Sequence, residues 1–331
     1  MLRMAANIDQ LDLAFEHVSK GDANNARFAL MLVDNLVEIT LHRLAQHKAA
    51  EHKARFRYRD KKEAPDPLLV EAEGRNFEPK VKYAKASVLL AEDTAASVVT
   101  LHTFRNQLYH VGLQHEPVLL ALSSFYFGIA CDLLSACTPT SWGYSPGMKL
   151  PERAAKYFGD DKHFMGGPEK YKKACTDLKT RAAELSPNLA TSLAAHMSDV
   201  IDEDDRLIDF LATDGFEKTS RNEVIVASQA WPFAFTDEGK RFAQENGCPA
   251  KFVAEHVEWI AKNYTWKYGR DPVPKWRERS QRVAREKDPH KALSMYCAFM
   301  DQTEDIRGLI YNSASQLDAA IQEQIDRARG K

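Results

Sequence analysis

The sequence predicts an all-α protein, because three long stretches have the residue spacing of helices. The first, 25–62, places apolar residues three and four positions apart, so that they form one stripe along a helix. The second, 118–137, is apolar nearly all round, as expected of a helix that is buried on most sides. The third, 288–329, repeats the helical spacing near the end of the chain. Together they predict a helical bundle with an additional helical region after it.

Shorter elements complete the N-terminal half. Residues 9–19 place Leu11 and Phe15 on one side and are expected to form a short amphipathic helix. Pro65 lies just after the long helix, and a short apolar piece, 68–72, follows it. Residues 80–90 lead into a further helix over 91–111, which either continues from them with a kink or starts afresh at Glu92.

A segment rich in glycine, proline and aromatic residues divides the chain. Glycine and proline break helices, whereas the aromatic residues indicate an ordered loop rather than a free linker. We therefore predict three parts: a helical bundle over 1–140, a connector over 141–168 and a helical C-terminal region over 169–331.

Four helices are predicted in the C-terminal region. Helical spacing covers 169–184, 188–212, 252–264 and 288–329. The segment 223–235 departs from this spacing, and it is expected to form a short strand or an extended arm.

Composition and charge limit the class of protein. The chain has 331 residues with 44% hydrophobic content, which is enough for one large or two ordinary domains. Its formal net charge of −2 means that any nucleic-acid contact must use local basic patches. Five cysteines without a Cys-x-x-Cys pair predict reduced thiols. No signal peptide is expected and 118–137 is interpreted as core, so we predict a cytoplasmic protein without a membrane span.

One group of polar residues stands out near the end of the helix predicted over 91–111. Arg105 and Asn106 are adjacent, and His110 follows Asn106 by four residues, which places both on one helix face. Histidine can give or take a proton at neutral pH, and arginine can stabilise a developing negative charge on phosphate oxygens. Asparagine can orient either partner. This set is sufficient for metal-independent cleavage of RNA.

The Arg105-Asn106 pair followed by His110 resembles the Arg-x4-6-His signature of the HEPN superfamily, which has a polar residue after the arginine in its ribonuclease members. The resemblance covers about the first 140 residues. It implies a HEPN-like bundle that works as a dimer with a composite site, and catalytic roles for Arg105, Asn106 and His110. Members paired with a nucleotidyltransferase antitoxin have a tyrosine two residues after the histidine, where this chain has Gly112.

Four further residues are candidates for supporting roles. His102 and Tyr109 lie close to the same side of the motif helix. Asp34 and Glu38 are four residues apart near the apolar stripe of 25–62, and in related folds an acidic residue on this second helix can face the Arg-His cleft. The alternative is a pair of solvated acids.

Two basic stretches with interleaved aromatic residues are candidate RNA-binding surfaces. The first ends the helix over 25–62 and the second precedes 288. The candidate residues are Arg55, Arg57, Arg59, Lys61, Lys62, Arg277, Arg279 and Arg282. The alternatives are a solvated helix end for the first and a surface helix anchored by tryptophans for the second.

No metal or cofactor is expected. Acidic residues gather over 199–205, but this pattern is more typical of a solvated face than of a divalent-metal site. The motifs of P-loop nucleotide binding, zinc proteases and esterases are missing from the sequence.

We therefore predict a metal-independent endoribonuclease that acts through the RNA 2′-OH, of the toxin or antiviral effector type that the resemblance implies. The expected partners are RNA, a second copy of the chain in a homodimer or higher homo-oligomer, and an antitoxin or another defence-system component. The alternative is a non-catalytic, HEPN-like RNA-binding or scaffold protein.

Overall fold

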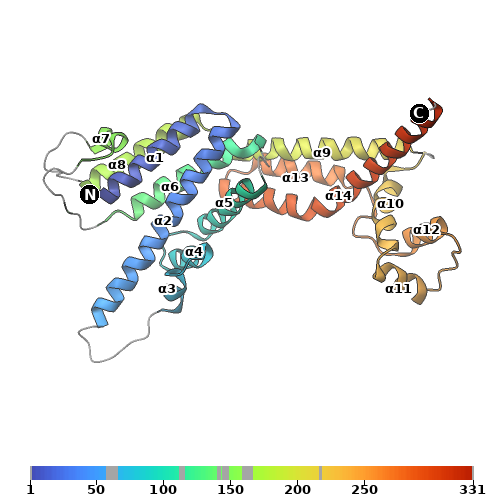
Figure 1. Cartoon of the computed structure of the whole chain (residues 1–331), viewed down its shortest axis with the longest axis horizontal. Helices are drawn as coiled ribbons and strands as arrows, with labels where there is room; N and C mark the ends of the chain where they lie inside the picture. Colours follow the sequence, from blue (N-terminus) through green and yellow to red (C-terminus); the bar gives the residue numbers. More distant parts are fainter. Residues whose placement is uncertain are drawn as a thin grey trace. The chain divides into compact units, whose positions relative to one another are not determined.

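The computed structural model describes residues 2–56, 66–111, 116–139, 143, 149–158, 167–215 and 218–329, and within these residues it is helical without a strand (Figure 1). This confirms the prediction of an all-α protein. The helices are α1 (Leu2–Lys20), α2 (Ala23–Phe56), α3 (Pro67–Ala72), α4 (Phe77–Ala86), α5 (Glu92–Val111), a 3-10 turn η1 (Glu116–Val118), α6 (Leu119–Ala136), α7 (Glu152–Phe158), α8 (Gly167–Leu185), α9 (Leu189–Thr213), α10 (Arg221–Ala234), α11 (Asp237–Glu245), α12 (Val253–Asn263), α13 (Val273–Arg285) and α14 (Pro289–Ala328).

The chain forms two compact units. The first unit comprises Met1–Ser192 and Lys287–Ser294, and the second comprises Leu193–Glu286 and Met295–Lys331. The first unit therefore includes α8, which the sequence division had assigned to the C-terminal region. The reason is packing, because α8 lies against both α6 and α1.

The core of the first unit is built by α1, α2, α6 and α8. Helix α6 packs against α2, α8 and α1, and its side chains Tyr126 and Phe127 are fully buried. Among the described helices, α6 is also long and apolar enough to cross a membrane. However, 67% of it is buried inside the structure, and the helices around it account for its apolar composition.

A second layer of the first unit positions the motif helix. Helix α5 packs against α4, α2 and α6. It starts afresh after the turn that ends α4, since the amide groups of Leu89 and Leu90 both donate to the carbonyl of Ala84. Below it, Ala45 and Ala49 of α2 form a small core with Leu69, Ala72 and Tyr83 of α3 and α4.

Helix α7 is attached to α1 through a buried charge. The Asp12 side chain is 1% exposed; it accepts a hydrogen bond from the Tyr157 hydroxyl and forms an ion pair with Lys156 Nζ at 2.6 Å. Arg153 adds an ion pair to Glu16 on the next turn of α1, at 2.9 Å. These contacts explain why part of the connector predicted over 141–168 is an ordered helix on the bundle.

In the second unit, α9, α13 and α14 lie side by side (Figure 1). Ser198 of α9 is bonded to Ser280 of α13 at 3.0 Å, and His196 of α9 to Tyr296 of α14 at 2.9 Å. The acidic stretch of α9 forms ion pairs with arginines of α10 and α13. Asp205 pairs with Arg221 and Arg277, and Asp202 pairs with Arg277. The prediction of a solvated acidic face was therefore wrong for Asp205, whose side chain is 27% exposed, whereas Asp202 is exposed.

The segment 223–235 is a helix, so the prediction of a strand or an extended arm was wrong. Ser220 and Glu223 form a capping box that starts α10. The buried residues follow helical rather than alternating spacing: Val224, Ile225, Ser228 and Gln229. Pro232 lies in the last turn, where it ends the helix instead of preventing it.

Asp204 is the buried member of the acidic stretch, and it provides a test of pH dependence. The residue is 5% exposed, and burial raises the pKa of its carboxyl from 3.8 to about 6, while the charge of Arg307 opposes this rise. Since the folded state favours the protonated form, the associated stability is fully present below pH 3.8 and is lost as the pH rises through about 6.

We expect Asp204→Asn to stabilise the second unit at pH 7.5 by about 1–3 kcal/mol and to give no such gain below pH 3.8. Urea unfolding followed by tryptophan fluorescence measures this, since four of the five tryptophans lie in the second unit. Asp199→Asn, which removes an exposed acid on the same helix, is the control. Destabilisation of Asp204→Asn at pH 7.5 would show instead that Arg307 keeps the carboxylate ionised.

Candidate functional site

The motif residues lie in the last turns of α5. Its first turn begins with Glu92 and Asp93, whose negative charges suit the N-terminal end of a helix. Arg105 and Asn106 lie more than three turns later, and Arg105 Nη1 donates to Asn106 Oδ1 at 2.8 Å. The backbone of His110 belongs to the same helix, one turn after Asn106. The side chains of Tyr109 and His110 lie outside the described residues.

A buried carboxylate on α2 holds this arrangement. Asp34 is 0% exposed, and Arg105 Nε forms an ion pair with its Oδ2 at 3.0 Å. His102 Nδ1 lies 3.0 Å from Oδ1 and 3.1 Å from Oδ2. Tyr126 of α6 donates its hydroxyl to Oδ1 at 3.0 Å. One carboxylate therefore forms an ion pair with Arg105 and hydrogen bonds with His102 of the same helix and with Tyr126 of α6.

Asp34 is thus not a solvated acid, and the sequence alternative that treated it as one is wrong. It lies on the side of α2 that faces α5 and α6, where the ion pair with Arg105 and the hydrogen bonds with His102 and Tyr126 replace the water that an ionised carboxylate would otherwise bind. Glu38 lies one turn further along α2 and is only partly buried, beside the buried amino group of Lys80. Burial lowers the pKa of Lys80, and the charge of Glu38 counteracts this effect.

The neighbours of Asp34 are themselves restrained. The His102 ring is stacked on Phe77 of α4, with ring centroids 3.9 Å apart and planes at 12°. Burial raises the pKa of Tyr126, and the adjacent Asp34 raises it further, so the hydroxyl remains a donor. Arg105 itself is held by the ion pair with Asp34 and the hydrogen bond to Asn106. Its side chain remains 28% exposed, so part of the guanidinium can reach a ligand.

Sequence reasoning missed Arg27, a second cation beside the motif. Its Nη2 donates to the backbone carbonyl of Leu108, two residues before His110, at 3.4 Å. Its Nε is buried without a hydrogen-bond partner, and within the described residues no carboxylate pairs with this side chain. The sequence gives no sign that Arg27 lies beside the motif, because its contact with Leu108 joins residues that are 81 positions apart.

Asp34, Glu38 and His102 also satisfy the distance requirement for a metal site. One potential ligand atom from each lies within 4.8 Å of the others. However, Arg105 Nε is bonded to Asp34 Oδ2, and this guanidinium charge would repel a divalent cation at the same carboxylate. The donors around Asp34 therefore suit an organising carboxylate better than a metal ligand.

Comparisons with protein-family models, with curated proteins and with solved structures find no match for the chain. The function of the chain is therefore inferred from the residues themselves and from the resemblance of their pattern.

The first predicted RNA-binding surface cannot be placed. Arg57, Arg59, Lys61 and Lys62 lie outside the described residues, as does the side chain of Arg55. Upstream of them, Lys48 and Lys53 of α2 pair with Glu51 and Glu73 at the surface. Surface pairs of this kind are weak and leave the cations available to other anions.

The second predicted surface is partly occupied by contacts within the protein. Arg277 pairs with Asp202 at 2.9 Å and with Asp205 at 2.7 Å. The guanidinium of Arg279 lies 5.1 Å from the ring centre of Phe299, which buries part of the charge. Arg282 pairs weakly with Glu278 at 3.6 Å, and both are exposed. An RNA-binding role for these residues stays a prediction, in which RNA would compete with Asp202 and Asp205 for Arg277.

Proposed function

We propose that this chain is a metal-independent endoribonuclease whose catalytic groups are Arg105, Asn106 and His110. The contact between Arg105 and Asn106 at 2.8 Å, held by the buried carboxylate of Asp34, is the observation that supports the proposal most strongly. It keeps a guanidinium and an amide in a fixed relation on the helix that also contains His110. The all-α bundle agrees with the implied fold.

The proposed reaction uses the RNA itself as nucleophile. A base accepts the proton of a 2′-OH, and the 2′ oxygen forms a bond to the adjacent phosphorus. The bond from phosphorus to the 5′ oxygen breaks, and an acid donates a proton to that oxygen. The products are a 2′,3′-cyclic phosphate and a 5′-OH. Arg105 stabilises the charge of the phosphorane, and Asn106 orients the reacting groups.

Base and acid are two separate roles, and the motif supplies one histidine for each chain. A homodimer that joins two motif helices brings two copies of His110 to one cleft, so that one acts as base and the other as acid. The biological setting that we propose, a toxin or antiviral effector in the cytoplasm with an antitoxin or defence-system partner, follows from the resemblance alone.

The direct test is to incubate the purified protein with total RNA in EDTA. We expect cleavage that leaves 2′,3′-cyclic phosphate ends, and we expect His110→Ala to reduce the rate by about 100-fold or more. His256→Ala, on α12 in the second unit, is the matched control and should keep full activity. Failure to cleave under any condition that permits RNA binding would contradict the proposal.

A second function is favoured by the complete burial of Asp34. A carboxylate that is paired with Arg105 and hydrogen-bonded to His102 and Tyr126 can serve simply to join α2, α5 and α6. In that case the chain is a non-catalytic RNA-binding or scaffold protein with the same bundle. RNA binding that weakens with added salt, without cleavage, would support this alternative.

A further inference from the structure

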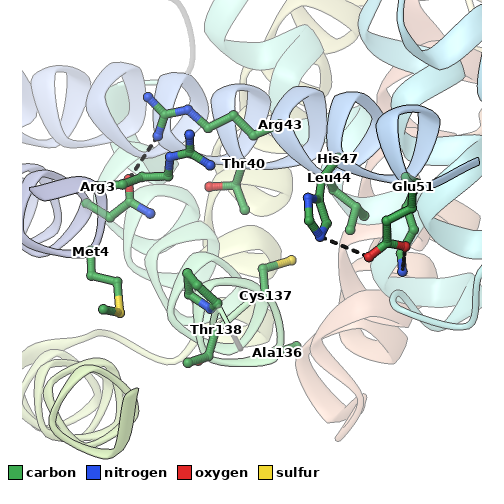
Figure 2. Close-up of a pocket in the computed structure, with 13 residues that line it drawn as sticks. Arg3, Met4, Thr40, Arg43, Leu44, His47, Glu51, Ala136, Cys137 and Thr138 are labelled. Atoms are coloured by element: carbon green, nitrogen blue, oxygen red, sulfur yellow. Dashed lines mark hydrogen bonds and ion pairs between the residues drawn. The ribbon is translucent and has the colours of Figure 1, made fainter. Parts of the chain in front are cut away.

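A pocket lies between α1, α2 and the end of α6, all in the first unit (Figure 2). Its volume is about 480 Å³, within the range of small-molecule sites. Arg3, Met4 and Asn7 line it from α1, and Thr40, Arg43, Leu44, His47, Lys48 and Glu51 from α2. Residues 136–139 at the end of α6 complete its lining.

One side of the pocket is positively charged. The guanidinium groups of Arg3 and Arg43 lie beside each other in Figure 2. Arg43 is bonded to Asn7 Oδ1 at 3.4 Å, and in the described part of the chain no carboxylate pairs with it. Burial lowers the pKa of Arg43, and the charge of Arg3 lowers it further. Two like charges that repel each other without a counter-ion favour an anion between them.

The other groups of the pocket do not cancel this charge. Glu51 is its one carboxylate among the described lining residues, and it is already paired with His47 at 3.0 Å and with Lys48 at 2.9 Å. In Figure 2, Glu51 and His47 lie at the opposite end of the pocket from Arg3 and Arg43.

An apolar surface adjoins the two arginines. Met4, Leu44, Ala136 and Pro139 contribute to it. Cys137 belongs with them, because burial raises the pKa of its thiol to about 11 and keeps it neutral. A ligand that fits both surfaces has an anionic group and a compact body that can lie against apolar side chains.

The pocket is separate from the motif site. Arg43 follows Asp34 by nine residues on α2, which corresponds to about 13 Å along the helix and about half a turn around it. A ligand in the pocket would therefore contact the face of α2 opposite to Asp34, and its binding does not depend on the proposed ribonuclease activity.

We propose that this pocket binds a small organic phosphate of the size of a mononucleotide, with the phosphate between Arg3 and Arg43 and the body of the ligand on the surface formed by Met4, Leu44 and Pro139. Guanidinium groups suit phosphate because they present several donors in one plane. The volume of about 480 Å³ accommodates a nucleoside as well as the phosphate.

Titration calorimetry of the full-length His110→Ala protein tests this, with AMP, GMP, CMP and UMP as probes and with adenosine, guanosine, cytidine, uridine and inorganic phosphate as comparisons. We expect at least one nucleotide to bind with a Kd below about 1 mM, and at least 10-fold more tightly than either its nucleoside or inorganic phosphate. Absence of binding by all four nucleotides would overturn the proposal, as would inorganic phosphate that binds equally well.

Two variants locate the site. Arg43→Gln and the exposed Arg3→Gln should each weaken nucleotide binding by about 10-fold or more. Lys53→Gln removes the same charge from α2 outside the pocket and should change binding little. If both arginine variants keep wild-type affinity, the nucleotide binds elsewhere and the proposal fails.

A structural role would also explain why Arg3 and Arg43 lie in this pocket. The last carbonyl groups of α6 carry partial negative charge, which attracts cations. On that explanation, Arg43→Gln lowers the stability of the first unit while the wild-type protein binds no nucleotide. That pair of results would also overturn the proposal.

Discussion

Asp34→Asn is expected to destabilise the first unit by about 3 kcal/mol, because it removes the charge from a buried carboxylate that pairs with Arg105 and forms hydrogen bonds with His102 and Tyr126. An asparagine at this position has one acceptor oxygen, and its amide group would face the donors of His102, Arg105 or Tyr126. The guanidinium of Arg105 would then remain partly buried beside a neutral group.

Urea unfolding followed by circular dichroism at 222 nm measures this loss. Four of the five tryptophans lie in the second unit, so tryptophan fluorescence should report a transition that changes little. Glu71→Gln is the control, since it removes the same charge from an exposed position on α3 of the first unit. Equal stability of Asp34→Asn and the wild type would show that the three donors are satisfied without the charge of Asp34.

Arg105→Lys is expected to reduce RNA cleavage by about 100-fold or more, with a smaller effect on RNA binding. Lysine keeps the positive charge, but a single ammonium group cannot contact Asp34, Asn106 and a phosphate oxygen in one plane. Single-turnover cleavage of a labelled RNA measures the rate, and a filter-binding assay measures the affinity.

Arg153→Lys provides the comparison for this substitution. Arg153 is also partly exposed and pairs with acids, Glu16 and Asp12, but it lies on α7 away from the motif. Its substitution should leave the cleavage rate unchanged. Cleavage by Arg105→Lys at the wild-type rate would remove Arg105 from the catalytic machinery and leave it a structural partner of Asp34.

Most helices could be predicted from the chain because their signals are local. The apolar run of α6, the stripe of α2 and the long final helix each place hydrophobic residues at helical spacing. This spacing shows that a helix face is buried even when the helix that covers it is unknown. Helix α10 was missed because its apolar residues are interrupted by Pro232 and rich in β-branched and aromatic types. The capping box at Ser220 and Glu223 was the local signal that could have corrected this prediction.

The candidate site was predictable in part. The neighbouring positions of Arg105, Asn106 and His110 are a property of one helix, and the sequence contains all of it. The role of Asp34 was not predictable. A solvated acid and a buried acid at this position of α2 have the same spacing from their neighbours along the helix. Arg277 is a similar case, because a basic residue on an amphipathic helix gives no sign that Asp202 and Asp205 lie across from it.

The sequence by itself determined that this protein is helical, where most helices lie and which three residues form the motif, because these properties depend on neighbours three or four positions apart. Only the tertiary structure decided that Asp34 binds Arg105 across 71 positions of the chain and that Arg3 and Arg43 share a pocket. Such contacts depend on which faces of distant helices meet, and spacing along one helix does not contain that information.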